Sequence, residues 1–139
     1  MKPQTKIIDL LLIEDDDNHA ELVRRALEDR TGQFRLRVAR SLREARIFIG
    51  QTPPDLVIAD WRLPDGKGLE ILPADRTSVP FPLVLMTSYG NEQLVVEVIK
   101  SGALDYVVKS PDSLSEIPHT AERALREWDL ICARRREEE

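Results

Sequence analysis

Four short apolar runs divide this chain of 139 residues, and a charged or hydroxyl-bearing side chain follows each of them. Most of these runs do not alternate with polar residues, which is typical of strands that are buried on both faces of a parallel sheet. A fifth run alternates with arginines and therefore indicates an edge strand. The five predicted strands span residues 7–13, 34–39, 56–59, 83–86 and 104–108.

Segments with apolar residues at helical spacing lie between the predicted strands. Ser41, with Glu44 three positions later, predicts an N-cap with a capping box. A helix after Gly66 must be short, because Pro73 interrupts it. Strand and helix therefore alternate, which predicts one α/β domain with a doubly wound, five-stranded parallel sheet and five helices that cover both of its faces. The apolar positions of three of these helices are Leu22, Val23, Ala26 and Leu27, then Leu42, Ala45 and Ile49, and then Leu94, Val95, Val98 and Ile99.

Charge and composition exclude several classes of function. The net charge is -5, and the basic residues are spread through the helices rather than gathered in one tract, so we expect no nucleic-acid partner. The apolar run near the N-terminus is interrupted by Asp9 and is too short for a signal peptide or a membrane span, so we expect no membrane association. The single Cys132 excludes an internal disulfide and fits a reducing, cytoplasmic compartment.

The residues that follow the predicted strands carry the chemistry, since ligands of open α/β sheets bind outside the carboxyl ends of the strands. Glu14 and Asp15 follow the first strand, Asp60 the third, Thr87 the fourth and Lys109 the fifth. The three carboxylates would converge in one crevice, where like charges raise at least one pKa unless a divalent cation is bound. Ligands that offer only oxygen favour Mg²⁺.

A carboxylate beside such a metal can attack a phosphoryl group and form an acyl phosphate. Asp60 is the natural candidate for this nucleophile. The ammonium of Lys109 would neutralise charge on the transferred group, and the hydroxyl of Thr87 would donate a hydrogen bond to one of its oxygens.

The order and spacing of four motifs resemble those of response regulator receiver domains over residues 7 to 125. The motifs are LLIEDD, DWRLPDGKGLE, VLMTS and GALDYVVKS. The resemblance implies a flavodoxin-like receiver fold and a phosphoacceptor signalling domain of a two-component phosphorelay. It implies at most autophosphorylation and autodephosphorylation activity, and a histidine kinase or phosphotransfer protein as the partner.

The resemblance also assigns roles to individual residues. Asp60 corresponds to the phosphoacceptor, Glu14 and Asp15 to the acidic pair that binds Mg²⁺, and the backbone carbonyl of Arg62 to a further metal ligand. Asp16 lies one position beyond the acidic pair and is expected to be a helix cap or a solvated residue. The residues that correspond to the phosphate-binding and switch positions are Thr87, Lys109 and Tyr106. An alternative for the tyrosine is a half-buried ring on an edge strand.

The sequence departs from the family in two places. Ser110 separates Lys109 from Pro111, whereas most members have a proline in a cis peptide directly after the lysine, so the geometry of this loop stays open. Arg62 and Tyr89, each two positions past a site residue, are bulky. The hypothesis is that they hinder the attacking water and lengthen the life of the phosphorylated state.

The final helix has an apolar stripe that is longer than a small sheet needs. We expect a receiver domain over residues 1–125, and over residues 126–139 an extension of the last helix that resembles the linker to a further module, as in hybrid histidine kinases. A long terminal helix without such a role is the alternative, and a homodimer through this helix is also expected. The stripe consists of Ile117, Ala121, Ala124, Leu125, Trp128, Ile131 and Cys132.

Two alternatives belong to other functional classes. Phosphatases with an aspartate nucleophile also use a strand-end aspartate and Mg²⁺, but here Asp60 lies in mid-chain and Leu63 and Pro64 follow it. A receiver-like interaction module that never takes phosphate would use only its helical surface. The presence of every type of site residue counts against that second alternative.

Overall fold

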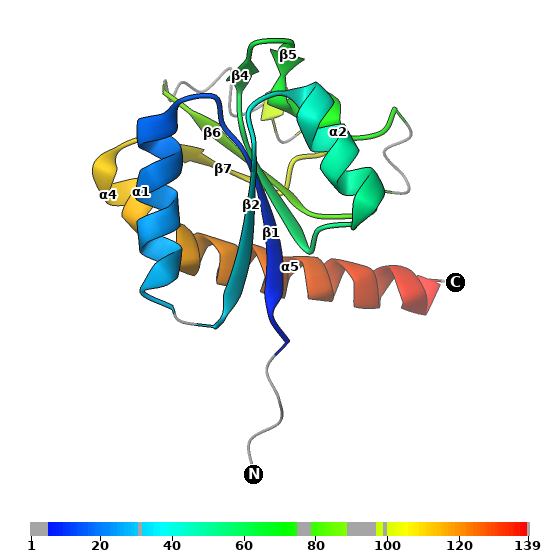
Figure 1. Ribbon diagram of the computed structural model, residues 1–139. Helices are drawn as coiled ribbons and strands as arrows, with labels where there is room; N and C mark the ends of the chain where they lie inside the picture. Colours follow the sequence, from blue (N-terminus) through cyan, green and yellow to red (C-terminus); the bar gives the residue numbers. More distant parts are fainter. Residues whose placement is uncertain (1–5, 31, 75–78, 89–96, 99, 139) are drawn as a thin grey trace.

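The computed structural model describes residues 6–30, 32–74, 79–88, 97–98 and 100–138, and it contains a parallel sheet of five strands (Figure 1). The strand order is β2-β1-β3-β6-β7, which confirms the predicted fold class. Asp60 and Thr87 are the last residues of their strands rather than the first residues after them. The bounds are β1 Ile8–Ile13, β2 Phe34–Ala39, β3 Leu56–Asp60, β6 Leu83–Thr87 and β7 Asp105–Val108.

Helices cover both faces of this sheet (Figure 1). On one face lie α1, α4 and α5, and on the other lie α2 and the 3₁₀ helix η1. The short η1 confirms the short helix predicted before Pro73. The bounds are α1 Asp17–Glu28, α2 Leu42–Gln51, η1 Gly68–Ile71, α4 Pro111–Ser115 and α5 Ile117–Glu138.

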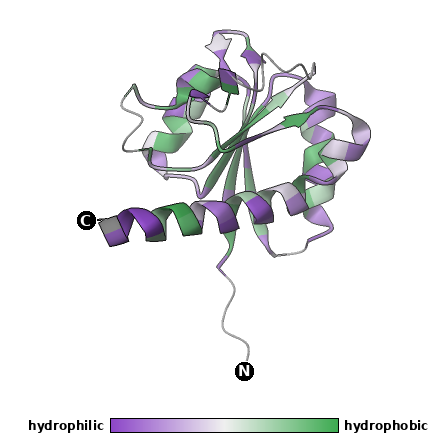
Figure 2. Cartoon of the chain, turned by 180° about the vertical axis from the view of Figure 1, so that it is seen from behind, coloured by the Kyte–Doolittle hydropathy of each residue, from purple (hydrophilic) through white to green (hydrophobic). Residues whose placement is uncertain are grey.

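The core consists of two apolar layers, one on each side of the sheet. Leu10 and Leu12 pack with residues of α1 and α5, while Leu11 and Ile13 pack against the α2 face. Successive side chains of a strand point to opposite faces, so a strand that is covered on both sides needs a continuous apolar run. Figure 2 shows these apolar strands between helices whose outer faces are hydrophilic. Burial of each such leucine or isoleucine side chain stabilises the folded state by about 1.5–3 kcal/mol.

The N-termini of α1 and α2 are capped by side chains. Asp16 caps α1 and accepts hydrogen bonds from the amides of Asn18 and His19, which confirms it as a cap. Ser41 caps α2 and accepts from the amide of Glu44, as its half of the predicted capping box requires. Asp65 supplements this cap from a neighbouring hairpin, because its carboxylate accepts from the first two amides of α2.

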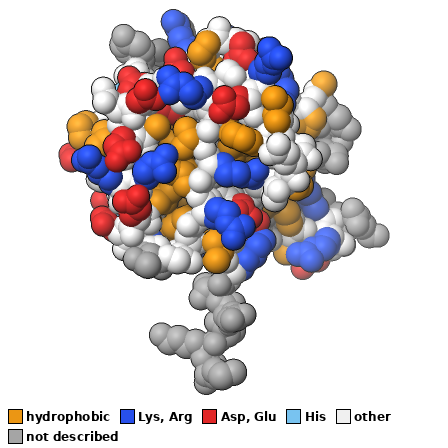
Figure 3. Space-filling view, in the orientation of Figure 1, with side chains coloured by type: hydrophobic (Ala, Val, Ile, Leu, Met, Phe, Trp, Pro, Cys, Tyr) orange, Lys and Arg blue, Asp and Glu red, His pale blue; other side chains and the backbone are white. Residues whose placement is uncertain are grey.

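The edge position predicted for β2 is confirmed. Arg35 lies 3.6 Å from Asp9 on the neighbouring strand β1, and Arg37 donates to the carbonyl oxygens of Phe48 and Thr52 at the end of α2. Side chains of both charges are mixed on this face of the molecule (Figure 3). Charged side chains on an edge strand disfavour pairing with another chain, and Arg37 also satisfies carbonyl groups at the end of α2.

The strand β7 differs from its prediction. It forms the other edge of the sheet, and Val107 is its only buried residue, so the expectation that residues 104–108 are buried on both faces is wrong. Val107 faces the core on one side of the sheet, and Tyr106 packs at the margin of the α2 layer on the other side. Apolar or aromatic residues therefore follow one another in the sequence of β7, as they do in an inner strand. The burial of β7 depends on its position in the strand order, and the local sequence does not contain that information.

The short helix α4 was not predicted. Ser110 is its N-cap and Pro111 its first residue, which is the arrangement that favours a helix start. The serine that separates the lysine from the proline therefore begins a helical turn, and the described residues contain no cis peptide. Of the helix predicted around residues 94–99, Leu94, Val95 and Ile99 lie outside the described residues, whereas Val98 is helical and buried.

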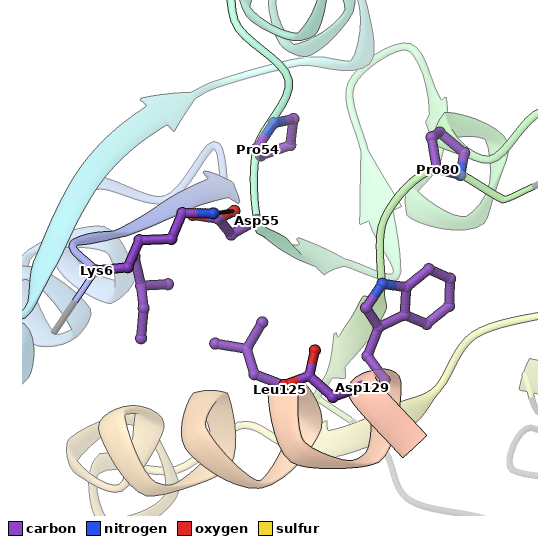
Figure 4. Close-up of a pocket in the computed structure, with 8 residues that line it drawn as sticks. Lys6, Pro54, Asp55, Pro80, Leu125 and Asp129 are labelled. Carbon is purple, nitrogen blue, oxygen red and sulfur yellow. Dashed lines mark hydrogen bonds and ion pairs between the residues drawn. The ribbon is translucent and has the colours of Figure 1, made fainter. Parts of the chain in front are cut away.

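The last helix, α5, extends beyond the sheet (Figure 1). Ile117, Ala121 and Ala124 are buried, but Leu130 in the distal half is 71% exposed. Leu125 and Asp129 point from this helix towards the ion pair of Lys6 and Asp55, across a cavity of 360 Å³ (Figure 4). No helix in the described part of the chain is long and apolar enough to cross a bilayer.

A small hairpin, β4 Arg62–Leu63 and β5 Gly66–Lys67, follows β3 and brings the chain back across its end. The amide of Gly68 donates to the carbonyl oxygen of Trp61 at 3.0 Å. A Cβ atom at Gly68 would collide with the carbonyl oxygen of Asp60 and would lie 3.1 Å from the Cβ of Ala59. The end of β3 therefore requires glycine at position 68.

We predict that Gly68→Ala lowers the free energy of unfolding by about 1–3 kcal/mol, because the backbone must shift to relieve the collision. Gly50→Ala is the matched control, since a Cβ there meets nothing within 4 Å. Gly50 lies in α2, so alanine should raise the free energy of unfolding by up to about 1 kcal/mol. Chemical denaturation measures both, and equal stability of Gly68→Ala and wild type would contradict the close approach.

Candidate functional site

Three carboxylates meet at the carboxyl end of the sheet. Ile13 and Ala59 are register partners in the paired strands β1 and β3, so the residues that follow them, Glu14 and Asp60, are neighbours. Carboxylate oxygens of Glu14, Asp15 and Asp60 lie within 4.8 Å of one another. Glu14 is only 1% exposed, whereas Asp15 is exposed and Asp60 is half-buried. The convergence predicted from the strand ends is confirmed.

Lys109 supplies the positive charge of this cluster. Its Nζ donates a hydrogen bond to Oδ2 of Asp60 at 2.7 Å and lies 2.7 Å from Oε2 of Glu14. The side chain is buried, with 6% of its surface exposed. The backbone places it there, because the amide of Lys109 donates to the carbonyl oxygen of Thr87 at 2.7 Å and so holds the chain beside β6.

Burial and charge shift the titration of both buried groups. Burial raises the pKa of the Glu14 carboxyl, and the charge of Asp60 raises it further, while Lys109 opposes both effects. Burial acts to lower the pKa of Lys109, but the carboxylates of Asp60 and Glu14 outweigh it and raise that pKa. The ammonium therefore stays charged at neutral pH, and the cluster holds more negative charge than its environment favours.

The donor set fits a hard divalent cation. Three carboxylates face one ammonium, which leaves two negative charges without a partner if all groups are ionised. Oε2 of Glu14 is buried, and among the described residues no group meets it in hydrogen-bonding geometry, although the ammonium lies nearby. An all-oxygen set with unbalanced charge is the chemistry that Mg²⁺ or Mn²⁺ selects.

Two residues at this site were not predicted from the sequence. Arg40, which follows β2, donates to the carbonyl oxygen of Asp15 at 3.1 Å and pairs with Asp17. His19, in the first turn of α1, has its Nδ1 3.2 Å from Nζ of Lys109. Both positions follow from the rule that strand ends and the first turns of the next helices share one edge, but the residues belong to no recognised motif.

The other predicted site residues lie at the same edge or outside the described residues. Thr87 is buried at the end of β6. Tyr106 is half-buried on the edge strand β7, with its ring against the α2 layer. Arg62 is exposed in β4, two positions past Asp60. Tyr89 lies outside the described residues, so its placement is untested.

The chain matches a family model for the response regulator receiver domain over residues 10–119. It is 42% identical over 124 residues to the methanogenesis regulatory protein FilR1 of Methanothrix harundinacea, a match that covers 86% of this chain and 28% of that protein. It is 34% identical to the response regulator protein PilR of Pseudomonas aeruginosa, with 84% of this chain and 26% of that protein covered. The chain thus spans about a quarter of the length of these relatives.

Solved structures of similar sequence have the same fold. NtrX from Brucella abortus superposes with a TM-score of 0.76 at 28% identity, covering 92% of this chain and 29% of that one. The Mn²⁺-bound form of the response regulator Rcp1 gives a TM-score of 0.68 at 26% identity, covering 79% of this chain and 88% of that one.

FilR1, PilR and Rcp1 are described as regulators, so the comparisons give no support to the expected receiver module of a hybrid histidine kinase. The family match covers more than half of the chain and includes all four quoted motifs. The site described above lies within the matched residues. The chain therefore belongs to the response regulator receiver domains, which are signalling modules of two-component systems rather than catalytic enzymes.

Proposed function

We propose that Asp60 accepts a phosphoryl group from a phosphohistidine on a histidine kinase or phosphotransfer protein. The observation that carries this proposal is the convergence of the Glu14, Asp15 and Asp60 carboxylates beside the buried ammonium of Lys109. A carboxylate oxygen of Asp60 attacks phosphorus, the bond from phosphorus to the imidazole nitrogen breaks, and an acyl phosphate forms. Lys109 orients the nucleophile, because it binds Oδ2 of the same carboxylate.

Glu14, Asp15, Asp60 and the backbone carbonyl of Arg62 are the proposed ligands of Mg²⁺. When bound, the ion supplies charge neutralisation for the oxygens of the incoming phosphoryl group. Two observations support this choice, namely the unbalanced charge of the cluster and the Mn²⁺-bound state of the relative Rcp1. Without a cation, the carboxylates would repel the anionic phosphoryl group.

Phosphorylation would change the molecule at its edge strand. The phosphoryl group adds about two negative charges and three acceptor oxygens at Asp60. The hydroxyl of Thr87 and the ammonium of Lys109 would bind these oxygens, and Tyr106 would change its rotamer on β7. We further propose that residues 1–125 are the receiver domain and that residues 126–139 extend α5 towards a further module. In this proposal the protein acts in the cytoplasm, and the last helix can also form a homodimer.

The phosphoacceptor role predicts a mass gain of one phosphoryl group when the protein is incubated with Mg²⁺ and a small phosphodonor. Asp60→Asn should abolish this gain, because an amide does not form the acyl phosphate. Asp112→Asn, at an exposed aspartate in the first turn of α4, should leave it unchanged. Intact-protein mass spectrometry measures all three. An adduct that persists in Asp60→Asn would refute the assignment. The absence of any adduct in the wild type would favour a passive interaction module. Steady release of phosphate would favour a phosphatase.

The metal assignment predicts that Glu14→Gln and Asp15→Asn each weaken Mg²⁺ binding by about tenfold or more, equivalent to about 1.4 kcal/mol. Fluorescence of Trp61, which directly follows Asp60 and is buried, reports the titration in a Trp128→Phe background. Removing Mg²⁺ with a chelator should also stop formation of the adduct. Asp112→Asn again serves as the control, and unchanged affinity in both acidic variants would place the cation elsewhere.

The role proposed for the bulky residues predicts a shorter life of the acyl phosphate in Arg62→Ala combined with Tyr89→Ala. The rate of phosphate loss should rise by about fivefold, which corresponds to about 1 kcal/mol of barrier. Lys67→Ala is the control, because it removes another exposed cation from the same hairpin. The decay of the phosphorylated mass over time gives the rates, and equal rates in the double variant and wild type would end the hypothesis.

A further inference from the structure

The buried ammonium of Lys109 has a third neighbour besides the two carboxylates. Nδ1 of His19 lies 3.2 Å from Nζ. A lysine ammonium offers three N–H donors and no acceptor, so Nδ1 can only accept in this contact. A hydrogen bond between the two groups therefore requires the tautomer that carries its proton on Nε2. Oε2 of Glu14, Oδ2 of Asp60 and Nδ1 of His19 thus all lie within 3.2 Å of Nζ.

The start of α1 fixes the position of His19. The carboxylate of Asp16 caps the helix and accepts from the backbone amide of His19 at 3.1 Å. Oε1 of Glu14 lies 3.6 Å from Nδ1 and Oδ2 of Asp16 lies 3.8 Å from it, so two carboxylates also face this nitrogen. Because the cap uses the backbone amide and not the ring, a substitution at position 19 leaves the helix start intact.

The site opens next to this imidazole. His19 and Lys109 line a cavity of 210 Å³, together with Ser88, Ser110 and apolar residues of α1 and α4. The histidine side chain is 34% exposed and borders both this cavity and the ammonium of Lys109.

We propose that His19 is a positioning residue for phosphoryl transfer, a proposal that rests on the function proposed above. The imidazole holds the ammonium of Lys109 against Asp60 before the phosphoryl group arrives. It also keeps one donor of that ammonium satisfied when another donor moves from a carboxylate to a phosphoryl oxygen. Loss of the imidazole leaves a buried N–H without a protein acceptor and lets the ammonium take other positions.

The test compares His19→Leu, which removes the acceptor, with His19→Gln, which retains one on a side chain of similar length. At saturating Mg²⁺ and with a small phosphodonor, we expect the adduct to form about fivefold more slowly in His19→Leu, as the loss of one hydrogen bond predicts. His19→Gln should stay within about twofold of wild type. His119→Leu, at the other histidine of the chain and on the exposed side of α5, is the control and should match wild type.

A second measurement is independent of phosphorylation. Nitrogen-15 NMR of the histidine ring should show the Nε2–H tautomer for His19, and Lys109→Met should change the Nδ1 shift. If His19→Leu forms the adduct at the wild-type rate, or if the ring carries its proton on Nδ1, the proposal is wrong. If the wild type takes no phosphate, the proposed function fails, and the NMR result alone then decides whether His19 accepts from Lys109.

Discussion

The ion pairs of Lys109 with Glu14 and Asp60 hold the carboxyl ends of the sheet together. Two carboxylates that close to each other would repel if no cation lay between them, and Glu14 is too buried to be shielded by water. The lysine follows β7, an edge strand that contributes little to the core, so this contact also links the edge to the strands at the centre. The site thus depends on opposite charges where the apolar layers end.

Much of this arrangement could be predicted, because burial on both faces of a parallel sheet leaves a local signal. The inner strands β1, β3 and β6 are continuous apolar runs, and parallel pairing then places their ends at one edge. The proximity of Glu14, Asp15, Asp60 and Lys109 follows from that topology without any knowledge of the side-chain conformations. Their roles in metal and phosphate binding remain predictions, since geometry alone does not test them.

The features that could not be predicted depend on contacts between distant segments. The edge position of β7 follows from the strand order, and nothing within residues 104–108 encodes it. His19 and Arg40 reach the site only because the first turn of α1 and the end of β2 lie over the strand ends. The helix α4 differs from these features, because its signal is local: Ser110 is the N-cap and Pro111 the first helical residue.

The cluster of the Glu14, Asp15 and Asp60 carboxylates is electrostatically unfavourable without a bound cation. Burial raises the pKa of Glu14, so the folded chain stabilises the ionised carboxylate less well than water does. A cation that binds only the folded state offsets this cost by mass action. The negative charge of the three carboxylates also repels an anionic phosphoryl group. Such a site can therefore accept phosphate only if bound cations neutralise enough of this negative charge. A buried lysine that touches both Glu14 and Asp60 meets part of that requirement before any ion or partner binds.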